Sequence, residues 1–329
     1  MRPYAIYVMD KNAKILIVGH NDILEQTLTG HFQSYGFKNV VSSSAIALNT
    51  TIQPSVYECF SKYRPEYVFL ASTRSGGIEA NQRQAGEFIY HNLESQNNVI
   101  YAAHKFGVKK LLFLASSCVY PKNCPQPIRE EYLLTGDLEK TSEPYAVAKI
   151  AGIKLCQAYR RQYGLNAIVA IPPTLFGPGS DVCLETAHVM GALIYKFCEA
   201  VKNNQKQVVV WGTGRPRREF LYTDDFAQGC HLLMDRYEGE KVIHMGYGSD
   251  LTIQELAQMI QRVSGFQGEV VFDESKPDGT LQKLLDNSDI RQLGWQSKVS
   301  LEEGIRRTYE WHKNRDKGLE EERIKGIKD

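Results

Sequence analysis

Short apolar runs alternate with helical patterns through the first half of the chain, and this alternation limits the fold more than any other feature. Continuous apolar runs are typical of strands that are buried on both faces of a parallel sheet. Consecutive parallel strands are joined by crossovers, which are usually helical and right-handed. The pattern therefore predicts an α/β fold with a doubly wound parallel sheet and helices on both of its faces.

The expected elements come in the order that such a sheet requires. Strands are predicted at 14–19, 39–41, 67–71, 110–116 and 167–171, with helices at 23–32, 56–62, 88–106 and 145–163. After residue 177 the pattern loosens, with a helix at 187–203 and a strand at 208–212. We expect 220–222, the helix from 224 and the strand 242–245 to return to the first layer. The strand 270–273 and the helix 301–312 are expected in a smaller cap.

The predicted division into domains is 1–176 plus about 220–248 for the first and 177–219 plus 249–315 for the second. A charged, frayed tail is expected at 316–329, within a poorly periodic stretch that begins at 313.

The composition is that of an ordinary soluble globular protein, with 43% hydrophobic and 23% charged residues among 329. A formal net charge of +1 gives no global field toward nucleic acid or membranes. There is no apolar run of membrane-spanning length and no signal pattern, so we expect a cytoplasmic protein. Seven cysteines without a Cys-x-x-Cys pair argue against a disulfide framework and against a structural metal site.

Two segments place chemically useful side chains near one edge of the predicted sheet. Ser116 and Cys118 follow an apolar run, at the carboxyl edge where doubly wound sheets bind ligands. Tyr145 and Lys149 open the next helical pattern four residues apart, so they share one helix face. Lowering a tyrosine pKa from about 10 to about 7 requires roughly 4 kcal/mol, to which a neighbouring cation contributes. The spacing recurs elsewhere in the chain, so the prediction of a proton donor depends on this serine strand and on Pro144.

Five motifs occur in one order: Ser-Ser-Cys-Val-Tyr-Pro, Glu-Pro-Tyr-Ala-Val-Ala-Lys, Trp-Gly-Thr-Gly, Arg-Glu-Phe-Leu and Ser-Lys-Pro-Asp-Gly, beginning at Ser116, Glu143, Trp211, Arg218 and Ser275. With these the chain resembles the GDP-L-fucose synthases, which are extended short-chain dehydrogenase/reductases, over nearly its whole length. The resemblance implies a Rossmann-type dinucleotide-binding domain followed by a smaller C-terminal α/β domain that binds a GDP-sugar. It also implies an NADP-dependent enzyme that epimerises GDP-4-keto-6-deoxy-mannose at C3 and C5 and then reduces C4.

The same resemblance assigns five catalytic residues. Ser116 is expected to orient the C4 carbonyl, and Tyr145 to donate a proton. Lys149 is expected to lower the tyrosine pKa and to hold the nicotinamide ribose. Cys118 is implied as the epimerisation base and His188 as the acid, although taken alone they would more often be a packing and a surface residue. The chemistry suits them, because a proton next to a ketone is acidic enough for a positioned thiolate, and an imidazole returns one to the opposite face.

Binding residues are carried over by position in the same way. The expected cofactor contacts are Gly19, Asn21, Lys149, Pro172, Thr174 and Leu175. The expected GDP-sugar contacts are Lys196, Trp211, Arg218 and Asp278. Arg218 offers a fork for phosphate and Trp211 a flat apolar face. Lys196 stands where the family has an arginine, so a phosphate contact there loses its bidentate geometry.

The glycine-rich turn expected after the first strand is altered. The chain reads Gly19-His20-Asn21-Asp22-Ile23-Leu24-Glu25, so two carboxylates replace glycines, and Asn21 replaces a common family arginine. If Asp22 and Glu25 face the pyrophosphate, each pair repels by roughly 3 kcal/mol at about 6 Å and an effective dielectric of about 20. Either carboxylate could instead occupy the helix N-terminus. The segment after the second predicted strand consists of serines at 42–44, without the basic residues expected near a 2′-phosphate. The sequence predicts weak cofactor binding and leaves NADPH, NADH and no cofactor open.

Three interpretations follow. The first is a GDP-4-keto-6-deoxy-mannose 3,5-epimerase/4-reductase. The second is an epimerase or reductase for a related GDP-4-keto sugar such as a heptose. The third is a catalytically silent GDP-sugar-binding subunit that pairs with an active paralogue. The five candidate catalytic residues favour the enzymes, whereas the altered turn favours the silent subunit. The resemblance implies a homodimer, and the near-neutral net charge predicts no nucleic-acid or membrane partner.

Overall fold

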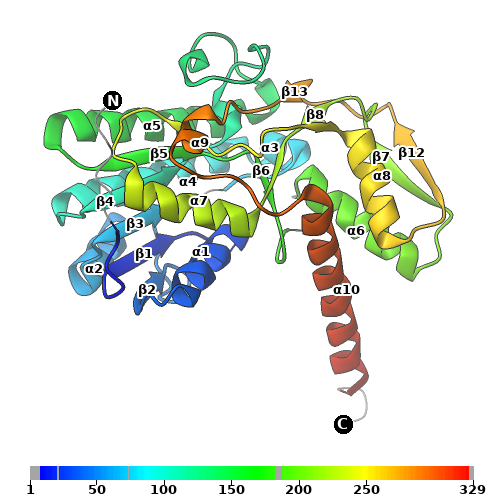
Figure 1. Ribbon diagram of the computed structural model, residues 1–329, viewed down its shortest axis with the longest axis horizontal. Coiled ribbons are helices and arrows are strands. Elements are labelled where there is room, and N and C mark those ends of the chain that lie inside the picture. The colour runs from blue at the N-terminus through cyan, green and yellow to red at the C-terminus, as the bar shows by residue number, and fades with distance from the viewer. Residues whose placement is uncertain (1–7, 21, 73, 182–186, 326–329) are drawn as a thin grey trace.

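The computed structural model describes residues 8–20, 22–72, 74–181 and 187–325, and its largest element is a six-stranded parallel sheet (Figure 1). The strand order is β10-β5-β4-β3-β1-β2, so it reverses between β1 and β3. This confirms the predicted doubly wound sheet. The strands are β1 (Lys14–Val18), β2 (Asn39–Ser42), β3 (Tyr67–Leu70), β4 (Lys110–Leu114), β5 (Ala167–Ile171) and β10 (Ile243–His244).

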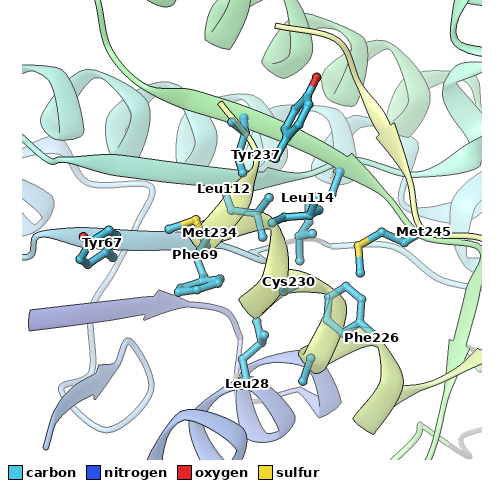
Figure 2. Packing of buried hydrophobic residues seen from close by; sticks show 14 of the residues in the cluster. Leu28, Tyr67, Phe69, Leu112, Leu114, Phe226, Cys230, Met234, Tyr237 and Met245 are labelled. Carbon is cyan, nitrogen blue, oxygen red and sulfur yellow. The ribbon is translucent and has the colours of Figure 1, made fainter. Parts of the chain in front are cut away.

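Helices cover both faces of this sheet, as predicted. On one face, α1 (Ile23–Ser34) and α7 (Thr223–Arg236) enclose a core that includes Phe69 and Leu112 (Figure 2). On the other face, Phe113 belongs to a second core. Successive strand residues point to opposite faces, so each strand supplies both cores and reads as one apolar run. The helices of the second face are α2 (Gln53–Tyr63), α4 (Ala85–Lys105) and α5 (Glu143–Tyr163).

A smaller group of elements lies beside the sheet (Figure 1). It contains three further pairings, β7 with β12 and β8 with both β11 and β13. Phe197, Val208, Ile260 and Ile305 contribute to a separate core there. The strands are β7 (Gln207–Trp211), β8 (Arg217–Arg218), β11 (Leu251–Thr252), β12 (Glu269–Asp273) and β13 (Gln282–Lys283), and the helices are α6 (Val189–Lys202), α8 (Ile253–Ser264) and α10 (Leu301–Lys325).

Two segments differ in detail from the expected layers. β9 (Phe220–Tyr222) pairs with β6 (Thr174–Phe176) in a separate sheet of two strands, and Leu221 packs into the core of the main sheet, so this segment returns to the first layer without joining its sheet. As expected, α7 packs on the main sheet and β10 pairs with β5 in it. α9 (Ser288–Gln292) and Trp295 pack into the first core although they fall within the segment assigned to the cap. The division into two domains remains a prediction, with 288–295 as an excursion toward the sheet.

The predicted frayed tail is also wrong as far as Lys325. α10 continues to that residue and extends away from the body of the molecule in Figure 1. Lysine, glutamate and arginine are good helix formers, and extending an existing helix costs much less than nucleating a new one. In the described part of the chain, every helix is too short or too polar to cross a membrane.

Candidate active site

The carboxyl end of β4 and the start of α5 bring predicted catalytic residues to one edge of the sheet. Ser116 follows β4, and its hydroxyl accepts a 3.4 Å hydrogen bond from the backbone N–H of Cys118. This contact caps the 3-10 turn Ser117–Val119, against which α5 packs. Tyr145 and Lys149 are 7% and 1% exposed on the buried face of α5. The Lys149 ammonium lies 6.0 Å from the centre of the Tyr145 ring.

Close contact with the sheet fixes the position of α5. A Cβ atom at Gly152 would lie 2.4 Å from Cζ of Phe113, so glycine allows the helix to approach β4. The side chain of Gln96 on α4 donates a 2.7 Å hydrogen bond to the carbonyl of Ala148. Tyr145 and Lys149 are therefore held on a helix that contacts both its strand and its neighbouring helix.

Lys149 lies at the carboxyl ends of β3 and β4, next to the point where the strand order reverses. Its ammonium donates hydrogen bonds to the carbonyls of Ser72, at 3.3 Å, and Leu114, at 3.1 Å, which follow or end β3 and β4. Burial lowers the pKa of Lys149 to about 7, although the negative charge of Asp22 opposes that shift. The Ser72 hydroxyl is also 2.8 Å from Nε2 of His20, beyond β1. These contacts form a polar network beside the switch point, where doubly wound folds bind their ligands.

Cys118 is paired with a residue that sequence reasoning missed. Lys283 on β13 donates a 3.3 Å hydrogen bond from its ammonium to Sγ of Cys118. Burial by itself raises the pKa of this thiol. The positive charge and hydrogen bond of Lys283, together with hydrogen bonds involving Ser116 and Ser142, outweigh that effect, so the pKa lies below 9.0. Lys283 pairs with Arg218 across β8 and β13, and its only sequence signal is that it follows the last motif.

His188 lies directly before α6, which begins at Val189 and not at 187 as expected. The side chain retains solvent access, yet burial by surrounding protein atoms lowers its pKa from 6.5. The charge of Asp181 opposes this shift and that of Lys283 adds to it. Lys283 therefore acts electrostatically on both the candidate base and the candidate acid.

Trp211 presents an exposed aromatic face at the end of β7, with 52% of the residue accessible. The ammonium groups of Lys196 and Lys276 lie 5.5 Å and 5.1 Å from its ring centre. Lys196 also donates a 2.8 Å hydrogen bond to the carbonyl of Val209. An apolar face with two cations beside it suits a flat, anionic ligand such as a nucleotide.

Asp278 contacts the turn that follows Trp211, and its negative charge acts on Arg218. The Asp278 carboxylate accepts hydrogen bonds from the backbone N–H of Thr213, at 3.0 Å, and from its hydroxyl, at 2.7 Å. Asp278 thus shapes the turn that carries Gly212. Arg218 is half-buried, and burial lowers its pKa while the charges of Cys118 and Asp278 oppose the shift.

In the altered glycine turn, Asp22 and Glu25 do not both point toward the expected pyrophosphate position. Asp22 caps α1, because its carboxylate accepts a 3.0 Å hydrogen bond from the backbone N–H of Glu25. Glu25 is 1% exposed and points inward, where Oε1 accepts hydrogen bonds from the Ser43 hydroxyl, at 2.9 Å, and the Ser44 N–H, at 2.8 Å. The expectation that both carboxylates face the pyrophosphate is therefore wrong for Glu25, which points inward. Asp22 takes the alternative position, as the cap of the helix. Ser43 is itself 2% exposed, whereas Ser44 is exposed to solvent.

The other predicted cofactor contacts lie along the same edge, except for Asn21, which falls outside the described residues. Gly19 donates a 2.9 Å hydrogen bond from its N–H to the Ser43 hydroxyl. Pro172 follows β5, and Thr174 and Leu175 belong to β6. Tyr145 and Lys149, side by side on the buried face of α5, suit the nicotinamide end of a dinucleotide. Around the end of β2, the sequence has no lysine or arginine between Lys38 and Lys62 to pair with a 2′-phosphate.

Among the described residues, no group of three or more histidine, cysteine, aspartate or glutamate side chains is arranged to hold a metal ion.

A parallel sheet with Ser116, Tyr145 and Lys149 at its carboxyl edge defines an enzyme of the short-chain dehydrogenase/reductase type. The model of the "NAD dependent epimerase/dehydratase family" matches residues 14–246, and the chain belongs to this family.

Similar proteins narrow this class further. "Probable GDP-L-fucose synthase 1" of Oryza sativa subsp. japonica is 50% identical over 94% of this chain and 95% of its own length. "GDP-L-fucose synthase" of Escherichia coli is 43% identical over 91% and 96%. The solved structure of MlghC, a GDP-mannoheptose C4 reductase from Campylobacter jejuni with NADP bound, is 37% identical with a TM-score of 0.84, covering 93% of this chain and 99% of that one.

Proposed function

We propose that this chain converts GDP-4-keto-6-deoxy-mannose to GDP-fucose, by epimerisation at C3 and C5 followed by reduction at C4. The contact between Cys118 and Lys283 carries the proposal, because a thiol whose pKa is lowered by an ammonium at 3.3 Å is prepared to act as a base. The family of the chain and its relatives named GDP-L-fucose synthase supply the substrate class.

The epimerisation needs a base and an acid on opposite faces of the sugar. The Cys118 thiolate removes the proton at C3 or C5, and the negative charge passes to O4 as an enolate. Protonated His188 then delivers a proton to the opposite face of the same carbon. Burial strengthens His188 as an acid, since it lowers the pKa from 6.5. Lys283 stabilises the thiolate form and disfavours a second positive charge on His188.

The reduction uses the residues on α5. A reduced nicotinamide dinucleotide supplies the hydride to C4, and NADP is the form described for the Campylobacter jejuni relative. Tyr145 transfers its phenolic proton to O4, which Ser116 orients by a hydrogen bond. Lys149 stabilises the phenolate that remains, with its ammonium 6.0 Å from the centre of the ring. Lys149 would also hold the nicotinamide ribose.

The GDP group is proposed to bind on the cap. Trp211 would stack on the guanine, while Lys196 and Arg218 contact the diphosphate. Asp278 would act through the turn that it shapes, because its carboxylate holds Thr213. Arg218 lies opposite Lys283 in the β8–β13 pair, so the phosphate and the reacting sugar would meet at adjacent strands.

A reductase for a GDP-heptose is the second candidate function. The solved GDP-mannoheptose C4 reductase is 37% identical and matches the fold along nearly its whole length. This function needs Ser116, Tyr145 and Lys149 but no acid–base pair. The lowered pKa of the Cys118 thiol favours the epimerase/reductase over it.

The test is incubation of the purified protein with GDP-4-keto-6-deoxy-mannose and either NADPH or NADH, with products identified by NMR. GDP-fucose should form, and Cys118→Ser should abolish it while Cys124→Ser, the matched control, retains it. Reduction without epimerisation would select the heptose-type reductase. Binding of GDP without any consumption of the keto sugar would select the silent subunit and contradict the proposed reaction.

We further propose that the chain forms a homodimer, as the family resemblance implies, and that it acts in the cytoplasm, as its composition suggests. Sedimentation of the purified protein should give the mass of two chains, and a single-chain mass would remove this part of the proposal.

A further inference from the structure

Glu25 is a buried acid that the proposed reaction does not use. It lies in the first turn of α1, yet its carboxylate reaches the end of β2. There Oε1 lies 2.8 Å from the Ser44 nitrogen and 2.9 Å from Oγ of Ser43. Oγ of Ser43 also lies 2.9 Å from the Gly19 nitrogen and 3.0 Å from its carbonyl oxygen. The carboxylate is thus part of a network that joins β1, β2 and α1.

The end of β2 is a defined place in a dinucleotide site. In doubly wound folds, an acidic residue about 20 positions after the glycine turn accepts a hydrogen bond from the adenosine ribose 2′-hydroxyl. This chain has serines at 42–44 and no acid there. Glu25 brings a carboxylate to the same strand end from the neighbouring helix. A Cβ atom at Gly19 would lie 2.5 Å from Cβ of Glu25, so the glycine makes room for this side chain.

The sequence around the end of β2 matches a hydroxyl better than a phosphate. The chain contains no lysine or arginine between Lys38 and Lys62, a segment that includes all of β2 and the turn after it. A carboxylate can accept a hydrogen bond from a ribose hydroxyl, whereas a 2′-phosphate offers negative charge and no strong donor at neutral pH. Burial of Glu25 strengthens both effects, because a low dielectric increases the interaction between charges.

We propose that Glu25 determines the dinucleotide preference of this chain, and that its buried carboxylate favours a free ribose 2′-hydroxyl over a 2′-phosphate. The inference rests on the proposed use of a nicotinamide dinucleotide. The relative that was solved with NADP differs from this proposal in preference only, since Tyr145 and Lys149 would act at the nicotinamide end, which NADH and NADPH share. NADH therefore binds this chain at least as tightly as NADPH.

Fluorescence titration of NADPH and NADH tests the preference without any sugar substrate. Glu25→Gln keeps the shape of the side chain and its acceptor oxygen but removes the charge. This change should tighten NADPH binding at least tenfold, or about 1.4 kcal/mol, and change NADH binding by less than about threefold. Glu58→Gln on the exposed face of α2 removes the same charge elsewhere and should leave both affinities unchanged.

Competition on the wild-type protein gives an independent readout if Glu25→Gln does not fold. Adenosine 5′-monophosphate should displace NADH at least as well as adenosine 2′,5′-diphosphate does. Tighter wild-type binding of NADPH than of NADH, or equal effects of Glu25→Gln on both, would overturn the inference. So would the absence of any dinucleotide binding. Failure of the proposed sugar reaction would appear separately, as intact dinucleotide binding without turnover.

Discussion

At the scale of single residues, Lys283 links the groups that the proposed chemistry uses. Its ammonium is 3.3 Å from Cys118, it lies opposite Arg218, and its charge lowers the pKa of His188. A cysteine in such an electropositive place reacts as a thiolate, whereas burial raises the pKa of Cys124 and keeps it protonated. Reactivity of the thiol is therefore a direct measure of this pair.

Iodoacetamide labelling, followed by peptide mass spectrometry across pH, measures that reactivity. Cys118 should label well before Cys124 as pH rises. Lys283→Met should move the midpoint for Cys118 upward by about one pH unit or more, which corresponds to about 1.4 kcal/mol. Lys276→Met removes an exposed lysine beside Trp211 and is the matched control. An unchanged Cys118 midpoint in Lys283→Met would show that the ammonium does not stabilise the thiolate.

Lys149 should give the protein a characteristic pH dependence of stability. Burial lowers its folded-state pKa to about 7 from 10.5, so the unfolded chain binds more protons between these values. The stability of the wild type should therefore rise with pH through this window, relative to Lys149→Met, by up to about 1.4 kcal/mol per pH unit. Urea unfolding at several pH values measures the gap, with Lys154→Met on the exposed face of α5 as control. A gap that does not change with pH would contradict a buried Lys149 that loses its proton.

At the scale of elements, α5 positions Tyr145 and Lys149 only if it stays close to β4. Gly152→Ala would place a methyl group 2.4 Å from the Phe113 ring, and overpacking of this kind costs about 1–3 kcal/mol. We expect reduced stability and slower reduction, because the helix must move away from the strand. Gly30→Ala is the control, since no atom lies within 4 Å of its added Cβ, and it should be neutral or stabilising by up to about 1 kcal/mol. Thermal unfolding and single-turnover reduction measure both effects, and equal behaviour of the two variants would refute the close-packing account.

The sequence predicts the main sheet and its helices because burial on both faces produces continuous apolar runs. It does not predict the partner of β9, since three apolar residues fit either sheet and only the tertiary fold decides between them. The end of α10 was missed for another reason. A charged segment has no apolar periodicity, yet its residues favour continuation of a helix.

The candidate site is predictable where it follows motifs and not where it depends on distant contacts. Ser116, Tyr145 and Lys149 lie at the expected edge because a strand end and a helix start place them there. Lys283 contacts Cys118 across 165 positions, a pairing that no local pattern contains. For Glu25 the sequence gives the charge, but the inward direction depends on Gly19, Ser43 and Ser44.

At the scale of the whole molecule, the proposed nucleotide binding and reduction use different parts of the chain. Trp211 and Arg218 belong to β7 and β8, whereas Tyr145 and Lys149 lie on a helix that packs on the main sheet. In the proposed function, the substrate would extend from one group of elements to the other. Variants on each side should therefore affect one function and leave the other intact.

Calorimetry with GDP tests this separation. Arg218→Ala should weaken GDP binding by about 1.5–3 kcal/mol, the range for a hydrogen bond to a charged group, and leave dinucleotide binding unchanged. Arg215→Ala removes an exposed arginine from the same turn and should have little effect. Equal losses in Arg218→Ala and Arg215→Ala would assign the effect to general charge and not to a phosphate contact.

Hydrogen exchange at C3 and C5 of GDP-4-keto-6-deoxy-mannose in deuterated water tests the acid–base pair most directly. Wild type and Tyr145→Phe should both incorporate deuterium, because proton removal at these carbons does not need the proton donor of the reduction. Cys118→Ala should slow incorporation at least about a hundredfold, the lower range for loss of a general base. Incorporation by Cys118→Ala at the wild-type rate would contradict the assignment of Cys118 as the epimerisation base.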